Sequence, residues 1–194
     1  RSGETLRYER TFTLPEGFRR DRVLLHFGAV DQCCRVLVND RPVGGHEGGY
    51  LPFTLDITGA LVPGENRLTV AVTDDPEGGV HAFGKQRTDR GGIWYTAQSG
   101  IWQTVWLESV PGTYIENLNI ENHGSSVTIS TVPPLDGTVS VEQLGQFPLE
   151  NRQVTIAPEN PHFWCPDDPY LYRFTVETAQ DKVESYFAIR SLEI

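Results

Sequence analysis

The sequence lacks the features that mark a membrane-spanning or nucleic-acid-binding protein. No apolar run approaches the roughly 18 residues that a membrane-spanning helix needs, so we expect no membrane partner. Basic residues are scarce, with 16 Lys and Arg against 26 Asp and Glu, and the net charge is −10. Because binding to phosphates requires a basic surface, this balance argues against a nucleic-acid partner.

Methionine is absent and cysteine is rare. The 194 residues begin with Arg-Ser-Gly and contain no Met, so we expect residue 1 to be a cut within a longer gene product, with or without a signal peptide ahead of it. The cysteines Cys33, Cys34 and Cys165 fit neither a disulfide framework nor a metal-ligand spacing. We therefore expect reduced thiols in a cytoplasmic protein. No Gly-rich phosphate loop occurs, and we expect no metal and no cofactor.

The pattern of apolar residues indicates an all-β protein. Nineteen Gly and 13 Pro divide the chain into short alternating segments, and no amphipathic helical run of useful length occurs. In the first part we expect strands at Leu6–Thr13, Arg22–Phe27, Cys34–Val38, Leu51–Asp56, Arg67–Val72 and Ile101–Glu108. Their spacing is typical of a β-sandwich. The stretch Thr73–Ser99 has little strand character, and loops of that length are usually functional or mobile.

A second pattern begins after Val110-Pro111-Gly112-Thr113, where the alternation becomes cleaner. We expect strands at Val127–Val132, Thr138–Val141, Val154–Ile156, Leu171–Glu177 and Val183–Ile189. Turns at His123-Gly124-Ser125 and Gln180-Asp181 separate some of them. Short strands in this arrangement predict an immunoglobulin-like sandwich, so we expect two domains, 1–111 and 112–194.

The most informative stretch runs from Gly28 to Thr58. Val36–Val38 forms a short apolar run, and Asn39-Asp40 supplies two residues able to take positive φ. Arg41–Val43 then starts a return strand, which predicts a hairpin. The glycines between 44 and 49 predict a loose connection before the next strand.

Four motifs in this stretch recur in one order in a known family: Val30-Asp31, Val38-Asn39, Gly45-His46 and Phe53 to Thr58. They resemble the galactose-binding-like jelly-roll domain of family 2 glycoside hydrolases, the β-galactosidase and β-glucuronidase group. Leu61–Val70 looks like the family's Leu-x-x-Gly-x-Asn-x-Leu-x-Val block, and Ser99–Glu108 like its closing strand. Three blocks in the correct order and spacing make this resemblance specific.

The second part resembles the immunoglobulin-like domain of the same enzymes. Phe163–Tyr172 looks like the Trp-x-Pro-x-x-Pro-x-Leu-Tyr motif, and Phe187–Arg190 like Phe-Gly-Ile-Arg, with Ala188 in place of Gly. In the family a (β/α)8 barrel of roughly 250 residues follows and carries both catalytic glutamates, one of them in an Asn-Glu pair. This chain has no Asn-Glu. The resemblance implies a non-catalytic part of a glycosidase acting on β-galactosides or β-glucuronides, which contacts sugar and supports the barrel.

Sugar contacts are expected from two loops that offer rings for stacking and polar groups for hydroxyls or an acid group. The substrate-binding candidates are His46, Tyr50, Arg87, Asp89, Arg90, Trp94 and Tyr95. We expect Asp31 and Asp56 to accept hydrogen bonds from turn backbone. Trp102 and Trp106 share strand parity, so we expect both in the core.

Two other functions remain open from the sequence. The chain could be a free-standing lectin-like module, which would bind glycans by itself with a micromolar or low-millimolar constant, whereas one wall of a cleft would bind free sugar very weakly. It could also be a structural or oligomerisation element whose loops touch no sugar. If the chain is part of a longer glycosidase, we also expect that enzyme to form a homo-oligomer.

Overall fold

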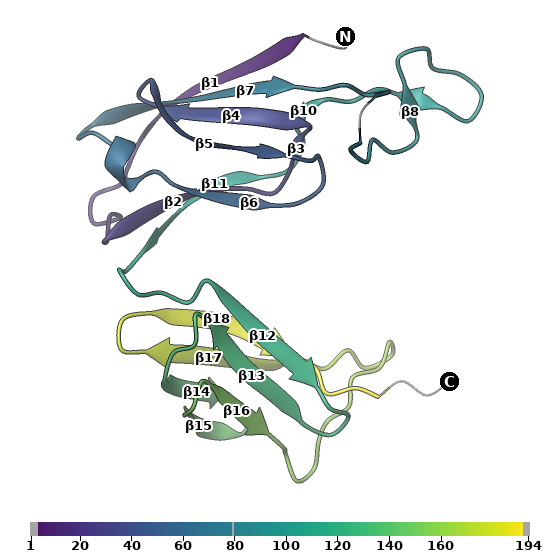
Figure 1. Ribbon diagram of the computed structural model, residues 1–194. Helices are drawn as coiled ribbons and strands as arrows, with labels where there is room; N and C mark the ends of the chain where they lie inside the picture. The colour runs from purple at the N-terminus through teal and green to yellow at the C-terminus, as the bar shows by residue number, and fades with distance from the viewer. Residues whose placement is uncertain (1–3, 79, 192–194) are drawn as a thin grey trace. The chain divides into compact units, whose positions relative to one another are not determined.

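The computed structural model describes residues 4–78 and 80–191 (Figure 1). The described chain consists of β-strands with one 3-10 turn, η1 (Thr58–Ala60), and no α-helix. It divides into two compact units, Arg1–Val110 and Pro111–Ile194, one residue from the boundary expected from the sequence. Each unit has its own hydrophobic core.

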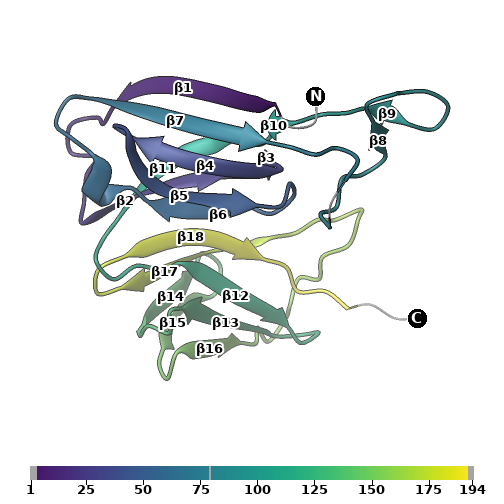
Figure 2. The ribbon, with the colours of Figure 1, turned by 45° about the horizontal axis from the view of Figure 1, so that its top comes forward.

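The first unit is a jelly-roll sandwich of two antiparallel sheets that lie face to face (Figures 1 and 2). One sheet has the order β1 (Thr5–Thr13), β7 (Glu65–Thr73), β4 (Cys33–Val38), β5 (Arg41–Glu47). The other has the order β11 (Val105–Val110), β2 (Arg22–Phe27), β6 (Phe53–Asp56). Two short pairs flank them: β3 (Val30–Asp31) with β10 (Gly100–Ile101), and β8 (Gln86–Arg87) with β9 (Tyr95–Thr96).

Alternation along the strands places one set of side chains between the sheets. On β2, Val23, Leu25 and Phe27 are at most 2% exposed and pack into the core. Val36 and Val38 reach the same core from β4 across the sandwich. Each such side chain contributes about 1.5–3 kcal/mol by leaving water.

The predicted hairpin is confirmed. Asn39 and Asp40 adopt φ of 52° and 62°, and β5 pairs antiparallel with β4. The Asn39 amide donates to the Ala60 carbonyl at 2.9 Å and to Asn66 Oδ1 at 2.8 Å. The two asparagines that carried the resemblance therefore hold three turns together and are structural.

Three expectations for this unit are wrong. His46 lies on β5 rather than in a loop, because the strand continues through Gly44 and Gly45 to Glu47. The expected strand Ile101–Glu108 is interrupted between β10 and β11. The alternation of side chains along β11 therefore does not extend back to Trp102. Trp102 and Trp106 are 52% and 45% exposed and lie outside the core. Trp106 instead stacks on His26 on the outer face of its sheet, with ring centroids 4.9 Å apart.

The second unit is an immunoglobulin-like sandwich. Its three-stranded sheet has the order β12 (Asn117–Asn122), β13 (Val127–Val132), β16 (Gln153–Ile156). Its four-stranded sheet has the order β15 (Gly145–Leu149), β14 (Gly137–Val141), β17 (Tyr172–Thr178), β18 (Lys182–Phe187). The edge strands β12 and β15 were not expected, since β12 is mostly polar and β15 contains Pro148, which an edge strand tolerates.

The Trp-x-Pro-like segment is tied into this second unit by several contacts. The Trp164 N–H donates to the Ile189 carbonyl at 2.8 Å, and the His162 N–H donates to the Tyr172 hydroxyl at 2.7 Å. The His162 ring stacks on Tyr170 at 4.0 Å, and its Nε2 lies 2.6 Å from Asp168 Oδ2. These contacts give the motif a structural role.

Candidate functional site

The long segment between β7 and β10, residues 74–99, projects from one end of the jelly roll, where β3 and β10 also lie (Figure 1). We call it the excursion. It was expected to lack strands, but β8 and β9 form a two-residue parallel pair within it, with Gln86 opposite Tyr95. Ser99 Oγ donates to Asp74 Oδ2 at 2.5 Å and so ties its two ends together.

A pocket of about 420 Å³ opens between the excursion, the turn after β5 and the end of β10. Four aromatic residues line it: Tyr50, Phe83, Tyr95 and Trp102. Asp31 and Lys85 are its charged lining residues. We call this cavity the aromatic pocket. Its volume falls within the range of small-molecule sites, and aromatic rings beside a few polar groups are typical of their walls.

Tyr50 and Trp102 form one wall of the aromatic pocket. Their ring centroids lie 6.1 Å apart in an edge-to-face arrangement, and the two side chains are 51% and 52% exposed. The Trp102 indole N–H donates to the Gly49 carbonyl at 2.8 Å, which fixes the ring against the turn after β5. A flat, half-exposed ring held in this way can pack against the C–H face of a sugar.

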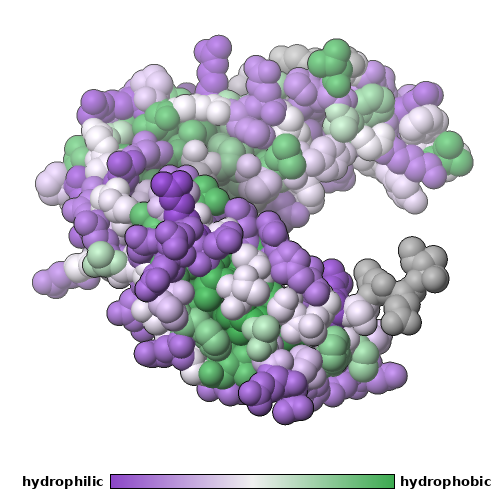
Figure 3. Space-filling view, turned by 60° about the horizontal axis from the view of Figure 1, so that its bottom comes forward, coloured by the Kyte–Doolittle hydropathy of each residue, from purple (hydrophilic) through white to green (hydrophobic). Residues whose placement is uncertain are grey.

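Exposed apolar side chains also occur on the excursion and beside Tyr50. Tyr95 is 70% exposed, Ile93 65% and Val80 96%, and Leu51, beside Tyr50, is 69% exposed. Figure 3 shows a hydrophobic residue at the surface at the far end of the excursion, among more hydrophilic ones. Clustered exposed apolar residues mark interaction surfaces, whereas isolated ones are common.

One carboxylate lines the aromatic pocket, and a second is hydrogen-bonded to one of the lining residues. Asp31, at the end of β3, lines it, and Asp74 is 8% exposed and hydrogen-bonded to Ser99, another lining residue. Burial, and then the negative charge of Asp74, raise the pKa of Asp31. Asp74 Oδ1 is buried without a hydrogen-bond partner in the described chain. Asp74 is thus buried and held by Ser99, whereas Asp31 is the carboxylate that lines the pocket.

Other buried polar atoms without partners gather at the same end of the first sheet. Thr73, Cys33 and Glu47 lie opposite one another on β7, β4 and β5. Asp74, Gln32 and His46 are their chain neighbours, and each has a buried side-chain N or O atom with no hydrogen-bond partner among the described residues. An unpaired buried polar group costs about 1–3 kcal/mol, and such groups concentrate at functional sites.

The structure brings some of the predicted site residues together. Tyr50 and Tyr95 line the aromatic pocket. The Arg87 guanidinium lies over the Trp94 ring at 4.0 Å, and Arg90 Nη1 donates to the hydroxyl of Thr96, a lining residue, at 3.2 Å. Asp89 is exposed, and the described residues that line the pocket do not include Arg87, Asp89, Arg90 or Trp94.

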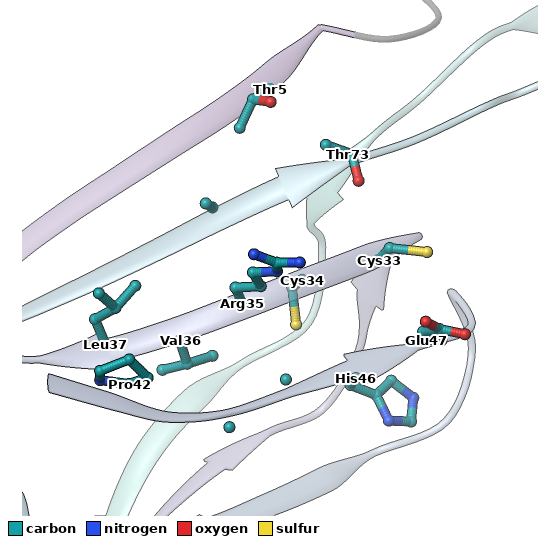
Figure 4. A pocket seen from close by; sticks show the side chains of 13 residues that line it. Thr5, Cys33, Cys34, Arg35, Val36, Leu37, Pro42, His46, Glu47 and Thr73 are labelled. Carbon is teal, nitrogen blue, oxygen red and sulfur yellow. The ribbon is translucent and has the colours of Figure 1, made fainter.

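His46 lies outside the aromatic pocket. Its ring is half-buried and stacks on Phe53 with centroids 4.4 Å apart. His46 borders a wider hollow of about 1150 Å³ on the outer face of the four-stranded sheet (Figure 4). Arg35 lines this hollow, and on the neighbouring strands it lies opposite Ala71 and Gly45. No Phe, Tyr or Trp is among the described residues that line this hollow, so stacking on a sugar favours the aromatic pocket.

Asp31, Lys85 and Trp102 were missed as site residues. Trp102 was assigned to the core by strand parity, although Ser99-Gly100 just before it is a chain-breaking signal. Asp31 was read as a turn residue, and its closeness to Asp74, 43 positions away in sequence, has no local signature.

The described residues show neither a metal centre nor a membrane span. No group of three or more His, Cys, Asp or Glu is placed to hold a metal ion in residues 4–78 and 80–191. Within the same ranges, no helix has the length and apolarity needed to cross a membrane.

Comparison with known families matches both units. Residues 2–111 match the family model described as "Glycosyl hydrolases family 2, sugar binding domain", and residues 112–190 match the one described as "Glycosyl hydrolases family 2". Together the two models span most of the chain and divide it next to the boundary between the units.

Individual relatives carry two enzyme names. A β-glucuronidase of Paenibacillus borealis is 30% identical over 88% of this chain and 32% of its own length. A β-galactosidase of Thermoanaerobacter pseudethanolicus is 26% identical over 88% of this chain and 25% of its own. The solved β-glucuronidase of Faecalibacterium prausnitzii superposes with a TM-score of 0.74 at 26% identity, over 97% of this chain and 38% of that one. The chain thus spans a quarter to two fifths of these relatives.

Proposed function

Because the chain belongs to glycosyl hydrolase family 2, we propose that it is the sugar-contacting part of a longer enzyme that cleaves β-glucuronides or β-galactosides. In this proposal a catalytic barrel elsewhere in that enzyme supplies the acid/base and nucleophilic carboxylates. The two sandwiches support the barrel, and the aromatic pocket forms part of the substrate-binding wall.

The observation that carries this proposal is the aromatic pocket in the domain that matches the family's sugar-binding model. Tyr50 and Trp102 offer half-exposed rings for the C–H face of a pyranose, while Asp31 and Lys85 offer groups for its hydroxyls. Rings of this kind bury much apolar area and lose little side-chain entropy, since they have few rotatable bonds. The chain's contribution is to bind and orient, and so to raise the fraction of substrate held for cleavage.

Relative activities test this proposal. The longer enzyme should hydrolyse aryl β-glucuronide or aryl β-galactoside, and the 194-residue chain alone should hydrolyse neither. In the longer enzyme, Tyr95→Ala should lower kcat/KM, while Tyr186→Ala, at a tyrosine of the second unit that is 57% exposed, should not. Turnover by the isolated chain, or equal kcat/KM in the two variants, would overturn the proposal.

Two further features belong to the proposal. We place the longer enzyme in the cytoplasm, a location supported by three cysteines that are all free thiols. We also propose that it is a homo-oligomer, to be measured by light scattering. If the chain is instead a free-standing lectin-like module, it will bind a simple sugar with a micromolar or low-millimolar constant. In that case, turnover will not be found in any longer protein that contains the chain.

A further inference from the structure

Asp31 is a half-buried carboxylate that the fold does not use. We expected Asp31 and Asp56 to accept hydrogen bonds from turn backbone. Asp56 does so, since its Oδ1 receives the Thr58 N–H at 2.9 Å and the Thr58 hydroxyl at 2.5 Å. For Asp31 that expectation is wrong: in residues 4–78 and 80–191 its carboxylate takes part in no hydrogen bond or ion pair.

The surroundings of Asp31 disfavour its charge. Burial, and next the negative charge of Asp74, raise the pKa of Asp31. Lys85 also lines the aromatic pocket, but in the described chain it forms no ion pair with Asp31. A folded state that holds a carboxylate in this setting is destabilised by it. A residue that costs stability and has no internal partner is a candidate for a ligand contact.

The position of Asp31 in the pocket suggests what that ligand offers. The carboxylate lies against Gly49, and the Gly49 carbonyl holds the Trp102 indole. One small turn therefore sets a hydrogen-bond acceptor beside a half-exposed aromatic wall. A ligand that contacts both the acceptor and the aromatic wall must have hydroxyl donors on one edge and an apolar C–H face. A pyranose has both.

We propose that the Asp31 carboxylate is the polar anchor of the aromatic pocket, accepting hydrogen bonds from the hydroxyl groups of a pyranose whose C–H face packs on Trp102. The inference rests on the proposed function, in which the aromatic pocket contacts carbohydrate. It adds the residue that distinguishes a sugar from other ligands of similar size. Charge-assisted hydrogen bonds of this kind are worth roughly a tenfold or greater difference in affinity.

Nuclear magnetic resonance on the 194-residue chain tests this directly. The Trp102 indole N–H signal is followed at neutral pH during titration with methyl β-galactoside, methyl β-glucoside or glucuronate. Tetrahydropyran, the same ring without hydroxyls, and choline, an organic cation, serve as comparison ligands. We expect at least one sugar to shift the signal, with the Kd of that sugar raised roughly tenfold in Asp31→Asn. Tetrahydropyran should bind more weakly than the sugars.

Two controls separate a ligand contact from a structural role. Asp40→Asn alters an exposed carboxylate paired with Arg67 outside the pocket, and it should leave the Kd unchanged. Asp31→Asn should raise the temperature of thermal unfolding at neutral pH, because it removes a disfavoured charge. A structural carboxylate would lower that temperature when replaced.

The outcomes are distinct. Sugar binding that is equal in the wild type and Asp31→Asn overturns the role of Asp31 and leaves the proposed function standing. Tighter binding of choline than of any sugar makes the pocket a cation site and overturns the inference. If no ligand shifts the Trp102 signal, the inference fails, while the kinetic test of Tyr95→Ala still decides the proposed function.

Discussion

Trp102 donates its indole N–H to the carbonyl oxygen of Gly49 at 2.8 Å, across 53 positions of sequence. This hydrogen bond joins the segment just after β10 to the turn that follows β5. It satisfies the only polar atom of the indole at the rim of the aromatic pocket, so the ring remains 52% exposed without an unpaired donor. Two segments that lie far apart in the sequence therefore form one site.

Replacing Trp102 by Phe should weaken sugar binding more than it weakens the fold. Phe keeps an aromatic ring but lacks the N–H that donates to the Gly49 carbonyl. Loss of this hydrogen bond removes about 1 kcal/mol that holds the ring in position. We expect a severalfold rise in the Kd of the best-binding sugar, measured by the same titration followed through backbone amides around the pocket. Trp106→Phe, at an equally exposed ring outside the pocket, is the matched control. Equal effects of the two variants would contradict the prediction.

Gly49 carries the second prediction. A Cβ at this position would collide with the Asp31 carboxylate, so Gly49→Ala must displace that side chain. We expect Gly49→Ala to weaken sugar binding about as much as Asp31→Asn does. Gly59→Ala meets no atom within 4 Å and should leave the Kd unchanged. Wild-type affinity in Gly49→Ala would show that Asp31 does not need its present position.

Asn66 should be among the most sensitive polar residues for stability. It is 2% exposed, and its amide makes hydrogen bonds with Val62, Gly64 and Asn39 between 2.8 and 3.0 Å. Asn66→Ala should lower the free energy of unfolding by about 2–4 kcal/mol, because several buried partners lose their bonds. Urea denaturation measures this, with the exposed Asn119→Ala as control. A loss below about 0.5 kcal/mol would contradict the structural role of the Gly-x-Asn block.

Local signals predicted local structure well. Asn39-Asp40 took the positive φ values expected of a hairpin turn, and the strand expected at Arg22–Phe27 formed with the same bounds as β2. The glycines after the hairpin were misread as looseness. Gly45 is in fact required by packing, since a Cβ there would collide with the Cys34 carbonyl of the paired strand. That requirement is set by the neighbouring strand and leaves no trace in local sequence.

The candidate site was predictable only in part. Tyr50 and Tyr95 were identified because exposed rings on Gly-rich segments suit sugar stacking, and both line the aromatic pocket. Asp31, Asp74 and Trp102 meet through tertiary contacts over more than 25 residues of sequence, which single-sequence periodicity cannot register.

Ionisation of Asp56 should contribute to the pH dependence of the free energy of unfolding. Burial would raise its pKa, but hydrogen bonds from the Thr58 hydroxyl and N–H, together with the Arg22 charge, lower it below 3.8. A lowered pKa contributes stability that is present above 3.8 and is lost as pH falls through the folded-state value. Asp56→Asn should therefore be less stable than wild type at neutral pH, by about 0.5–1 kcal/mol, and the difference should shrink in acid.

Urea denaturation across this pH range measures the difference. Asp136→Asn, at an exposed carboxylate of the second unit, should show no such trend. A constant difference between Asp56→Asn and wild type from neutral pH to below the folded-state pKa would exclude the linkage.

Above all, we propose that this chain contacts substrate through the aromatic pocket in a family 2 enzyme. The most direct measurement is kcat/KM of the longer enzyme carrying Tyr50→Ala together with Trp102→Ala, assayed on aryl β-glucuronide and aryl β-galactoside. We predict a fall of at least roughly tenfold on the better substrate, since two rings lose their contact with sugar. The same kcat/KM as the wild-type enzyme, with the fold intact by thermal unfolding, would contradict the account.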